Sequence, residues 1–431
     1  MGSEQFSGNR SSDPRSPRKI ALTPFFRVAL PFIAGYFVSY VYRMVNAVLG
    51  PTLAAEFGLS AGGLGLLTSV YFLAFAFFQV PLGLLLDRYG PRRVNATLLL
   101  VAAAGGLAFA AAETASAAIA ARALIGIGVS GCLMAAFTAY VLWYPPERLP
   151  FINGVTFSAG AIGAMVATVP LELLLRVLPW RQSFLLIVGA TLAVSLVLWL
   201  WVPEGTARTK GTTLAESMRG FAGLLRDAVF VRLAVCLGAS QLAAVSLQTL
   251  WIAPWLRDVA GYSPAQVARG LLVINVALIA GYLGFARAAE ALARRKRDVF
   301  WLLAGGLGVS NLCLAVVVFT PPAAAMPLWF AFVGANSAVV LGYAVLSGRF
   351  PRAMAGRVNT GLNVFGFVGM FTGQWLFGVI LDLWPQTPAG YAPEAYPWAI
   401  GLLWSVQLAG LLWLLSGRAL FASKPSALER A

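Results

Sequence analysis

Long apolar segments recur along the chain and are separated by short polar connections. Each contains at least about 18 residues, enough for an α-helix to cross a hydrocarbon core of about 30 Å. Twelve segments are predicted to span a membrane, at residues 25–48, 63–86, 94–113, 117–142, 152–175, 182–202, 229–256, 266–289, 299–320, 326–347, 357–381 and 396–417. The chain is therefore predicted to be an all-α integral membrane protein with twelve transmembrane helices.

The longest polar stretch, residues 203–228, divides the segments into two sets of six. Three residues of the fifth segment recur in the eleventh at a constant offset of 206 positions: Asn153 as Asn359, Gly160 as Gly366 and Gly163 as Gly369. This match indicates a duplicated unit, with two pseudo-symmetric six-helix bundles. We predict a disordered tail at 1–24, bundles at 25–202 and 229–418, a linker at 203–228 and a second tail at 419–431.

Composition supports a membrane protein and narrows the chemistry. Of the 431 residues, 59% are hydrophobic and 11% are charged, and the mean hydropathy is +0.80; soluble domains carry roughly 25% charged residues. The chain has no histidine, and its three cysteines lie far apart in apolar segments, without the spacing of a zinc or redox site. We therefore predict no metal, no cofactor and no catalytic residue, and an enzyme is not expected.

The formal net charge of +15 predicts an orientation rather than a nucleic-acid partner. With both termini placed in the cytoplasm, all but six of the 31 Lys and Arg residues fall on that side, the six being Arg43, Arg122, Arg176, Arg181, Arg257 and Arg269. This is the positive-inside bias of inner (plasma) membrane proteins. Nucleic-acid binders instead gather their basic residues in one patch. The expected partners are membrane lipid and a small molecule, and we expect a monomer.

One motif follows the second apolar segment: Gly83-Leu84-Leu85-Leu86-Asp87-Arg88-Tyr89-Gly90-Pro91-Arg92-Arg93. It resembles the major facilitator superfamily signature G-x-x-x-D-R-x-G-R-R, with Pro91 at one basic position. The sequence Arg122-x-x-x-Gly126-x-Gly128 resembles a second pattern of that family. The resemblance implies the major facilitator fold and transport by alternating access. It also implies a conformational latch that stabilises the outward-open state, formed by Gly83, Asp87, Arg88, Gly90, Arg92 and Arg93.

Arg43 is the leading candidate for a substrate ligand, because a charge inside a membrane segment is costly and usually marks function. Tyr40 and Asn46 lie one helical turn away on either side. The surrounding sequence is similar to the first span of organophosphate and anion-cation symporters, in which an arginine holds the phosphate or carboxylate of the substrate. A guanidinium offers paired donors to such groups. The alternative is a structural arginine bound to backbone carbonyls or a tyrosine hydroxyl.

The second half lacks a matching arginine. Organophosphate antiporters have an arginine in the seventh span, six residues before a tryptophan. In this chain the tryptophan corresponds to Trp251, and the residue six positions before it is Val245. Gln241 and Gln248 could supply neutral hydrogen bonds instead, which favours a monoanion or a larger, partly neutral solute. Further polar residues could line the substrate path or bridge helices; these are Asn275, Asn336, Asn359, Asn363 and Gln374.

Three residues are candidates for coupling transport to an ion, either H⁺ or Na⁺: Arg122, Glu172 and Asp382. Glu172 and Asp382 lie near the outer ends of their segments, and no acid lies in the middle of a span. The favoured function is a secondary active transporter of a small organic anion. Proton-coupled efflux of amphipathic compounds is the alternative, and a receptor-like protein that no longer transports is a third reading.

Overall fold

The computed structural model describes residues 25–145, 148–204, 222–295, 297–347, 350, 355–385 and 390–422. Every secondary-structure element assigned within these ranges is a helix. The predicted tail at 1–24, most of the predicted linker (205–221) and residues 423–431 of the second tail lie outside the described residues.

The first half of the chain forms six membrane-spanning segments. Its elements are η1 (Phe25–Ala29), α2 (Leu30–Phe57), α3 (Ala61–Ala110), α4 (Ala115–Val129), α5 (Cys132–Trp143), α6 (Leu149–Val166), α7 (Val169–Leu175) and α8 (Trp180–Trp201). Helix α3 has 50 residues, which at 1.5 Å per residue is about twice the length needed to cross a bilayer. It is broken at Gly90, where φ is 78° and ψ is 162°. Glycine adopts this backbone without steric cost, so α3 contains two spans joined by the predicted turn.

The second half repeats this organisation. Its elements are α10 (Ala228–Ser246), η3 (Leu247–Trp251), α11 (Ile252–Asp258), α12 (Pro264–Arg294), α13 (Phe300–Val317), η4 (Pro322–Ala324), α14 (Met326–Asn336), η5 (Ser337–Val340), α15 (Leu341–Ser347), α16 (Ala355–Leu381), η7 (Pro393–Ala395), α17 (Tyr396–Ser416) and α18 (Arg418–Ala422). In the described ranges, 11 helical segments are long and apolar enough to cross a membrane. Because α3 crosses twice, they correspond to the twelve predicted spans.

Polar side chains cap several helices where the apolar segments begin. The Ser60 hydroxyl accepts from the Gly63 amide at the start of α3, and the Thr114 hydroxyl accepts from Ala117 at the start of α4. Asp227 caps α10. Caps of this kind satisfy amide groups that the first helical turn leaves unpaired, and so fix where each span begins.

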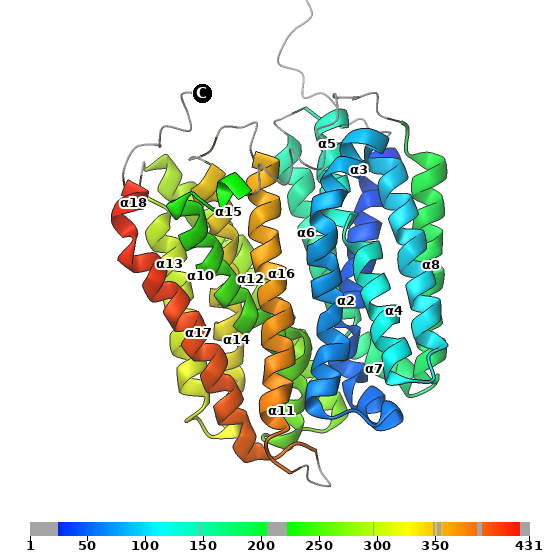
Figure 1. Ribbon diagram of the computed structural model, residues 1–431, viewed down its shortest axis with the longest axis vertical. Helices are drawn as coiled ribbons and strands as arrows, with labels where there is room; N and C mark the ends of the chain where they lie inside the picture. The colour runs from blue at the N-terminus through cyan, green and yellow to red at the C-terminus, as the bar shows by residue number, and fades with distance from the viewer. Residues whose placement is uncertain are drawn as a thin grey trace, which may run out of the picture.

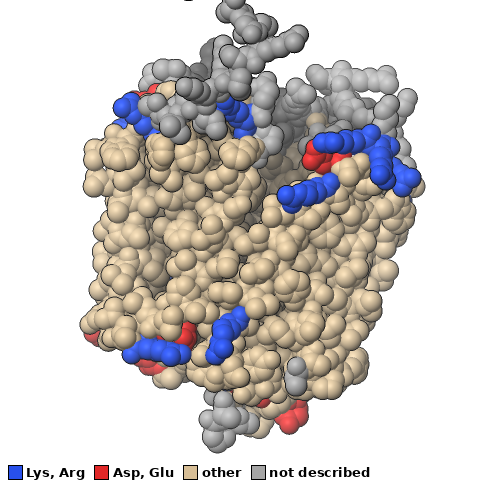
Figure 2. Space-filling model, turned by 180° about the vertical axis from the view of Figure 1, so that it is seen from behind, with Lys and Arg blue, Asp and Glu red and all other residues tan. Residues whose placement is uncertain are grey.

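The helices form two groups that stand side by side (Figure 1). Elements α2 to α8 make one group and α10 to α18 the other, with α16 at the border, in contact with α3. On the face seen in Figure 2, the charged residues gather at the two ends of the molecule and leave a broad uncharged band between them. This distribution suits a protein whose middle lies in hydrocarbon.

Two pairs of helices approach each other at equivalent places in the two halves. A Cβ at Gly163 of α6 would lie 2.4 Å from the carbonyl oxygen of Phe37 in α2, and a Cβ at Gly369 of α16 would lie 2.3 Å from that of Gly238 in α10. Small residues permit such close packing between membrane helices. The glycines that recur in the sequence therefore mark one packing contact, made once in each half.

Candidate functional site

Arg43 lies near the middle of its span and is held by aromatic rings from both halves. Its guanidinium carbon is 4.5 Å from the ring centroid of Tyr40, 5.9 Å from that of Phe72 and 5.5 Å from that of Phe367. Tyr40 and Phe72 belong to α2 and α3, whereas Phe367 belongs to α16. The faces of these rings stabilise a cation in place of a counterion.

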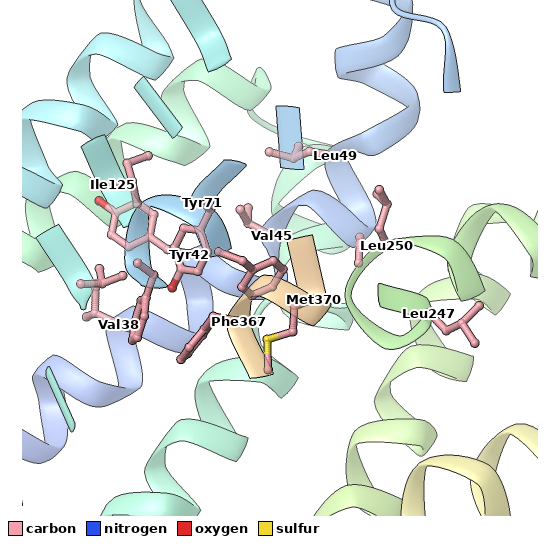
Figure 3. Packing of buried hydrophobic residues seen from close by; sticks show 14 of the residues in the cluster. Val38, Tyr42, Val45, Leu49, Tyr71, Ile125, Leu247, Leu250, Phe367 and Met370 are labelled. Atoms are coloured by element: carbon pink, nitrogen blue, oxygen red, sulfur yellow. The ribbon is translucent and has the colours of Figure 1, made fainter. Parts of the chain in front are cut away.

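Phe367 belongs to a core shared by the two halves. Figure 3 shows Phe367 and Met370 of α16 beside Val45 of α2, with Leu250 of η3 nearby. The ring of Phe367 also stacks on Phe75 of α3, with centroids 4.0 Å apart. Arg43 nevertheless stays half-buried, so its guanidinium lies between the halves and is not sealed within one of them.

Arg122 lies at the same membrane level as Arg43. It is fully buried, and its Nη1 donates to the backbone oxygen of Tyr42, the residue before Arg43, at 3.0 Å. Its guanidinium carbon lies 5.2 Å from the ring centroid of Tyr71. Nε and Nη2 of Arg122 and Nε of Arg43 have no hydrogen-bond partner within the described part of the chain.

Neither arginine has a carboxylate partner among the residues that the structure describes. The seven ion pairs found there all lie near the ends of helices, and none includes Arg43 or Arg122. Tyr71 connects the two cations: Arg122 lies over its ring, and its hydroxyl interacts with Arg43 and donates to the Ser39 carbonyl at 3.3 Å. The centre of the protein thus contains two positive charges at one level, and the described residues supply no counterion for them.

Three of the predicted neutral ligands bind other protein groups. Asn46 is fully buried and donates to the hydroxyl of Thr68 at 3.1 Å. Gln248 donates to the side-chain oxygen of Asn275 at 3.1 Å. Asn336 is buried as well, and its side-chain oxygen accepts from the Ser240 hydroxyl at 2.5 Å and from Gln407 at 3.4 Å.

Other polar groups of the second half remain partly accessible. Gln241 and Asn363 are half-buried, and the side-chain oxygen of Asn363 accepts from the Tyr343 hydroxyl at 2.6 Å. Tyr343 lies close to Tyr40, and Tyr282 lies close to both Tyr40 and Arg43. No feature of the sequence singles out Tyr282, Tyr343 or Phe367, because an aromatic residue in an apolar segment is equally typical of packing.

Gln241 occupies the position in the second half that Tyr40 occupies in the first. A Cβ at Gly160 would lie 3.0 Å from the Tyr40 ring, and a Cβ at the recurring Gly366 would lie 3.8 Å from the Gln241 side chain. The same correspondence between α2 and α10 pairs Arg43 with Ala244. The first half therefore supplies the charge at this level and the second half supplies none.

The residues of the predicted latch lie on the face opposite Asp382. Asp87 is exposed and forms no ion pair or hydrogen bond with any residue that the structure describes, and a Cβ at Gly83 would meet nothing within 4 Å. Arg88 lies over the ring of Tyr89, and Arg92 and Arg93 pair with Glu204 at the end of α8. Hydrogen bonding to Arg93 lowers the pKa of Glu204.

Asp382 connects the two halves on the other face. Its carboxylate accepts from the Ser60 hydroxyl at 2.7 Å and from the amides of Ala61 and Gly62 at 2.8 Å each. These donors form the N-terminus of α3, where the helix dipole favours a negative charge. Glu172, the other acidic candidate, pairs instead with Arg176 at 2.8 Å within the first half.

Close backbone contacts extend from Asp382 into the membrane. A Cβ at Gly378 would lie 2.3 Å from the Ala61 carbonyl oxygen, and a Cβ at Gly65 would lie 2.7 Å from that of Gln374. Helices α3 and α16 therefore touch through small residues, and the halves are closed together on this face.

Comparisons with known proteins agree with this architecture. The family model of the Major Facilitator Superfamily matches residues 32–374. The probable sulfoacetate transporter SauU of Cupriavidus necator is 24% identical, over 80% of this chain and 85% of its own. A putative tartrate transporter of Agrobacterium vitis is 24% identical, over 87% and 90%. The crystal structure of the nucleoside transporter NupG superposes with a TM-score of 0.71 at 13% identity, covering 90% of this chain and 99% of that one.

Proposed function

The chain belongs to the major facilitator superfamily, and from this premise we propose that it is a secondary transporter of a small organic monoanion, with Arg43 as the ligand of the anionic group. The observation that carries the proposal is the pair of arginines at one membrane level without a carboxylate partner among the described residues. Two uncompensated cations in a poorly polarisable interior attract an anion strongly.

The number of charges favours a monoanion. Arg122 is fully buried, which leaves Arg43 as the accessible cation, and neither Ala244 nor Val245 of α10 supplies a second one. Two relatives are named as transporters of sulfoacetate and tartrate. Each of these compounds has two acidic groups, so the relatives support an organic anion as the substrate but not its single charge.

Among the coupling candidates we favour Arg122. Arg122 lies over the ring of Tyr71, and the hydroxyl of Tyr71 interacts with Arg43. A shift in the position of one arginine can therefore alter the position of the other through one side chain. Glu172 and Asp382 lie at the end of the molecule and already have partners.

We further propose that the Asp87 face is cytoplasmic, as the distribution of Lys and Arg indicates, with both termini on that side of a plasma membrane. The closed Asp382 face is then the outer one, so the described conformation is closed to the outside, as in an inward-open state. The Gly160 and Gly163 contacts hold α6 against α2, which supports movement of each half as one body during alternating access.

Arg43 substitutions test the proposal on the purified full chain. Binding of a panel of organic anions is measured by thermal stabilisation and calorimetry. Arg43→Gln removes a charge-assisted hydrogen-bonded pair worth about 1.5–3 kcal/mol, so affinity should fall roughly ten- to a hundredfold. Arg43→Lys keeps the charge without the paired donors and should weaken binding less.

Arg27→Gln is the matched control, because Arg27 is an exposed arginine at the end of the same span. It should bind anions as wild type does. If Arg43→Gln binds the anions as well as wild type but melts at a much lower temperature, Arg43 is structural and the proposal fails. Stabilisation by lipophilic cations, and by no anion, would favour the efflux alternative.

A further inference from the structure

We infer, resting on the proposed function, that the body of the transported anion is apolar and planar, as in an aromatic carboxylate or sulfonate, and is not polyhydroxylated. The inference comes from the side chains that surround Arg43. A guanidinium fixes the anionic group of a ligand, but the neighbouring groups decide what the rest of the ligand can be.

The nearest neighbours of the guanidinium are the rings of Tyr40, Phe72 and Phe367. Phe75 supports Phe367 from behind, since the two rings stack at an interplanar angle of 28°. Phe72, Phe75 and Phe367 are buried, with 1%, 7% and 7% of their surface exposed, so a ligand would meet these rings only on entering beside Arg43. Aromatic faces of this kind bind flat apolar groups through stacked or edge contacts. An anionic ligand at Arg43 therefore has its body against rings supplied by both halves.

A second group of rings lies one turn along α2. Tyr36 packs against Tyr40, with centroids 5.0 Å apart, and against Phe157 of α6, with centroids 6.1 Å apart. Phe157 is 41% exposed, whereas Tyr36 is buried. Gly160 makes the arrangement possible, because a Cβ there would lie 2.6 Å from the Tyr36 ring.

Among the described residues, few polar groups at this level are free to receive hydroxyls. Asn46, Gln248 and Asn336 are buried and bound to other side chains, and of these only Asn46 keeps a buried, unpaired side-chain oxygen, Oδ1. A polyhydroxylated acid would lose its hydrogen bonds to water and recover few of them, at a cost for each unpaired hydroxyl. The accessible groups that remain, Gln241 and Asn363 with the tyrosine hydroxyls, suit at most one or two polar substituents on the ligand.

The test compares anions that differ in the body. Benzoate, benzenesulfonate, cyclohexanecarboxylate and acetate are monoanions, whereas tartrate and sulfoacetate are dianions at neutral pH, so weaker binding of these two cannot result from a smaller charge. Equilibrium binding to the purified full chain is measured with benzoate, benzenesulfonate, cyclohexanecarboxylate, acetate, tartrate and sulfoacetate. We expect benzoate and benzenesulfonate to bind at least about tenfold more tightly than acetate, tartrate and sulfoacetate, with cyclohexanecarboxylate in between. Tighter binding of tartrate or sulfoacetate than of benzoate would overturn the inference.

A pair of variants on one helix tests the role of the rings. Phe367→Leu should weaken benzoate binding roughly two- to tenfold more than acetate binding, because only the ring of benzoate loses a stacking partner. Phe371→Leu is the control: Phe371 lies one turn further along α16 and stacks on Trp375, which is 38% exposed. If Phe367→Leu changes the affinity of every anion equally, the rings only cover Arg43 and do not select the ligand.

The outcomes separate this inference from the proposed function. If tartrate or sulfoacetate binds most tightly and Arg43→Gln abolishes that binding, the transporter of organic anions stands and the aromatic ligand is wrong. If no anion binds in a way that depends on Arg43, the proposed function itself fails. Binding of benzoate that requires both Arg43 and Phe367 supports both.

Discussion

Arg43 and Arg122 are stabilised by groups that carry no negative charge. Arg122 donates to one backbone oxygen and lies over the ring of Tyr71, while Arg43 lies among three rings. Interactions with aromatic faces contribute about 0.5–2 kcal/mol each, less than the cost of removing a guanidinium from water. The interactions with protein groups therefore do not fully compensate the free energy of desolvating the two guanidinium groups. A bound anion can supply the rest, which is the physical basis of the proposed specificity.

At the scale of single residues, Gly163 offers a test of the packing within the first half. Because a Cβ there would lie 2.4 Å from the Phe37 carbonyl oxygen, Gly163→Ala should force α6 and α2 apart. We expect a loss of about 1–3 kcal/mol in stability, the usual range for overpacking, measured as a lower melting temperature in detergent.

Gly154→Ala provides the control for this substitution on the same helix. A Cβ at Gly154 would meet nothing within 4 Å, so the alanine should be neutral or stabilise α6 by up to about 1 kcal/mol through its higher helix propensity. Equal melting temperatures for the two variants would contradict the close contact at Gly163.

The sequence could identify Arg43 because a charge in an apolar segment is rare. It could not separate Asn46 or Gln248 from true ligands, because an amide in such a segment can equally line a path or bond to a neighbouring helix, and here both bond to neighbours. No feature of the sequence distinguished Phe367 from the other apolar residues of its segment. Its place beside Arg43 depends on how the two halves pack, which no local pattern encodes.

At the scale of elements, length and hydropathy were enough to predict all twelve spans, including the break of α3 at Gly90. Interruptions inside spans were not predicted. The fourth span divides into α4 and α5, the fifth into α6 and α7, and the seventh contains η3. These irregularities leave the average hydropathy of a segment unchanged, and neighbouring helices satisfy the backbone groups that they free.

The contact of α3 with α16 gives a prediction for the outer face. Asp382→Asn removes the negative charge that receives three hydrogen bonds at the N-terminus of α3. The closed outer face should lose about 1–2 kcal/mol, which corresponds to about a five- to thirtyfold shift toward the outward-open state.

Spin labels on Val177 and Phe319 would report this shift. The two residues are 75% and 88% exposed and follow α7 in the first half and α13 in the second, so their separation grows as the outer face opens. Glu394→Gln, which changes an exposed acid near the start of α17, should leave the distance distribution unchanged. If Asp382→Asn also leaves it unchanged, Asp382 does not hold the face closed.

At the scale of the whole molecule, two acidic residues on opposite faces belong to opposite states. Asp382 is bound to the first half in the described conformation, whereas Asp87 is exposed and has no partner there among the described residues. The resemblance to the family implies that the Asp87 cluster engages in the outward-open state. Each carboxylate would then stabilise one conformation and leave the free energy of the other unchanged. The two together would set the equilibrium between the conformations in the absence of ligand.

This arrangement predicts opposite effects for the two neutral substitutions. Asp87→Asn should leave the inward-open state untouched and destabilise the outward-open one, so the Val177–Phe319 distances should move toward the short, closed population. Transport should slow, while insertion into the membrane and thermal stability stay as in wild type.

Because the two sites lie at opposite ends of the protein and share no partner, their free-energy changes should add. The double variant Asp87→Asn with Asp382→Asn should therefore return the distance distribution close to that of wild type. A double variant that matches either single variant would show that only one of the two carboxylates acts on the equilibrium.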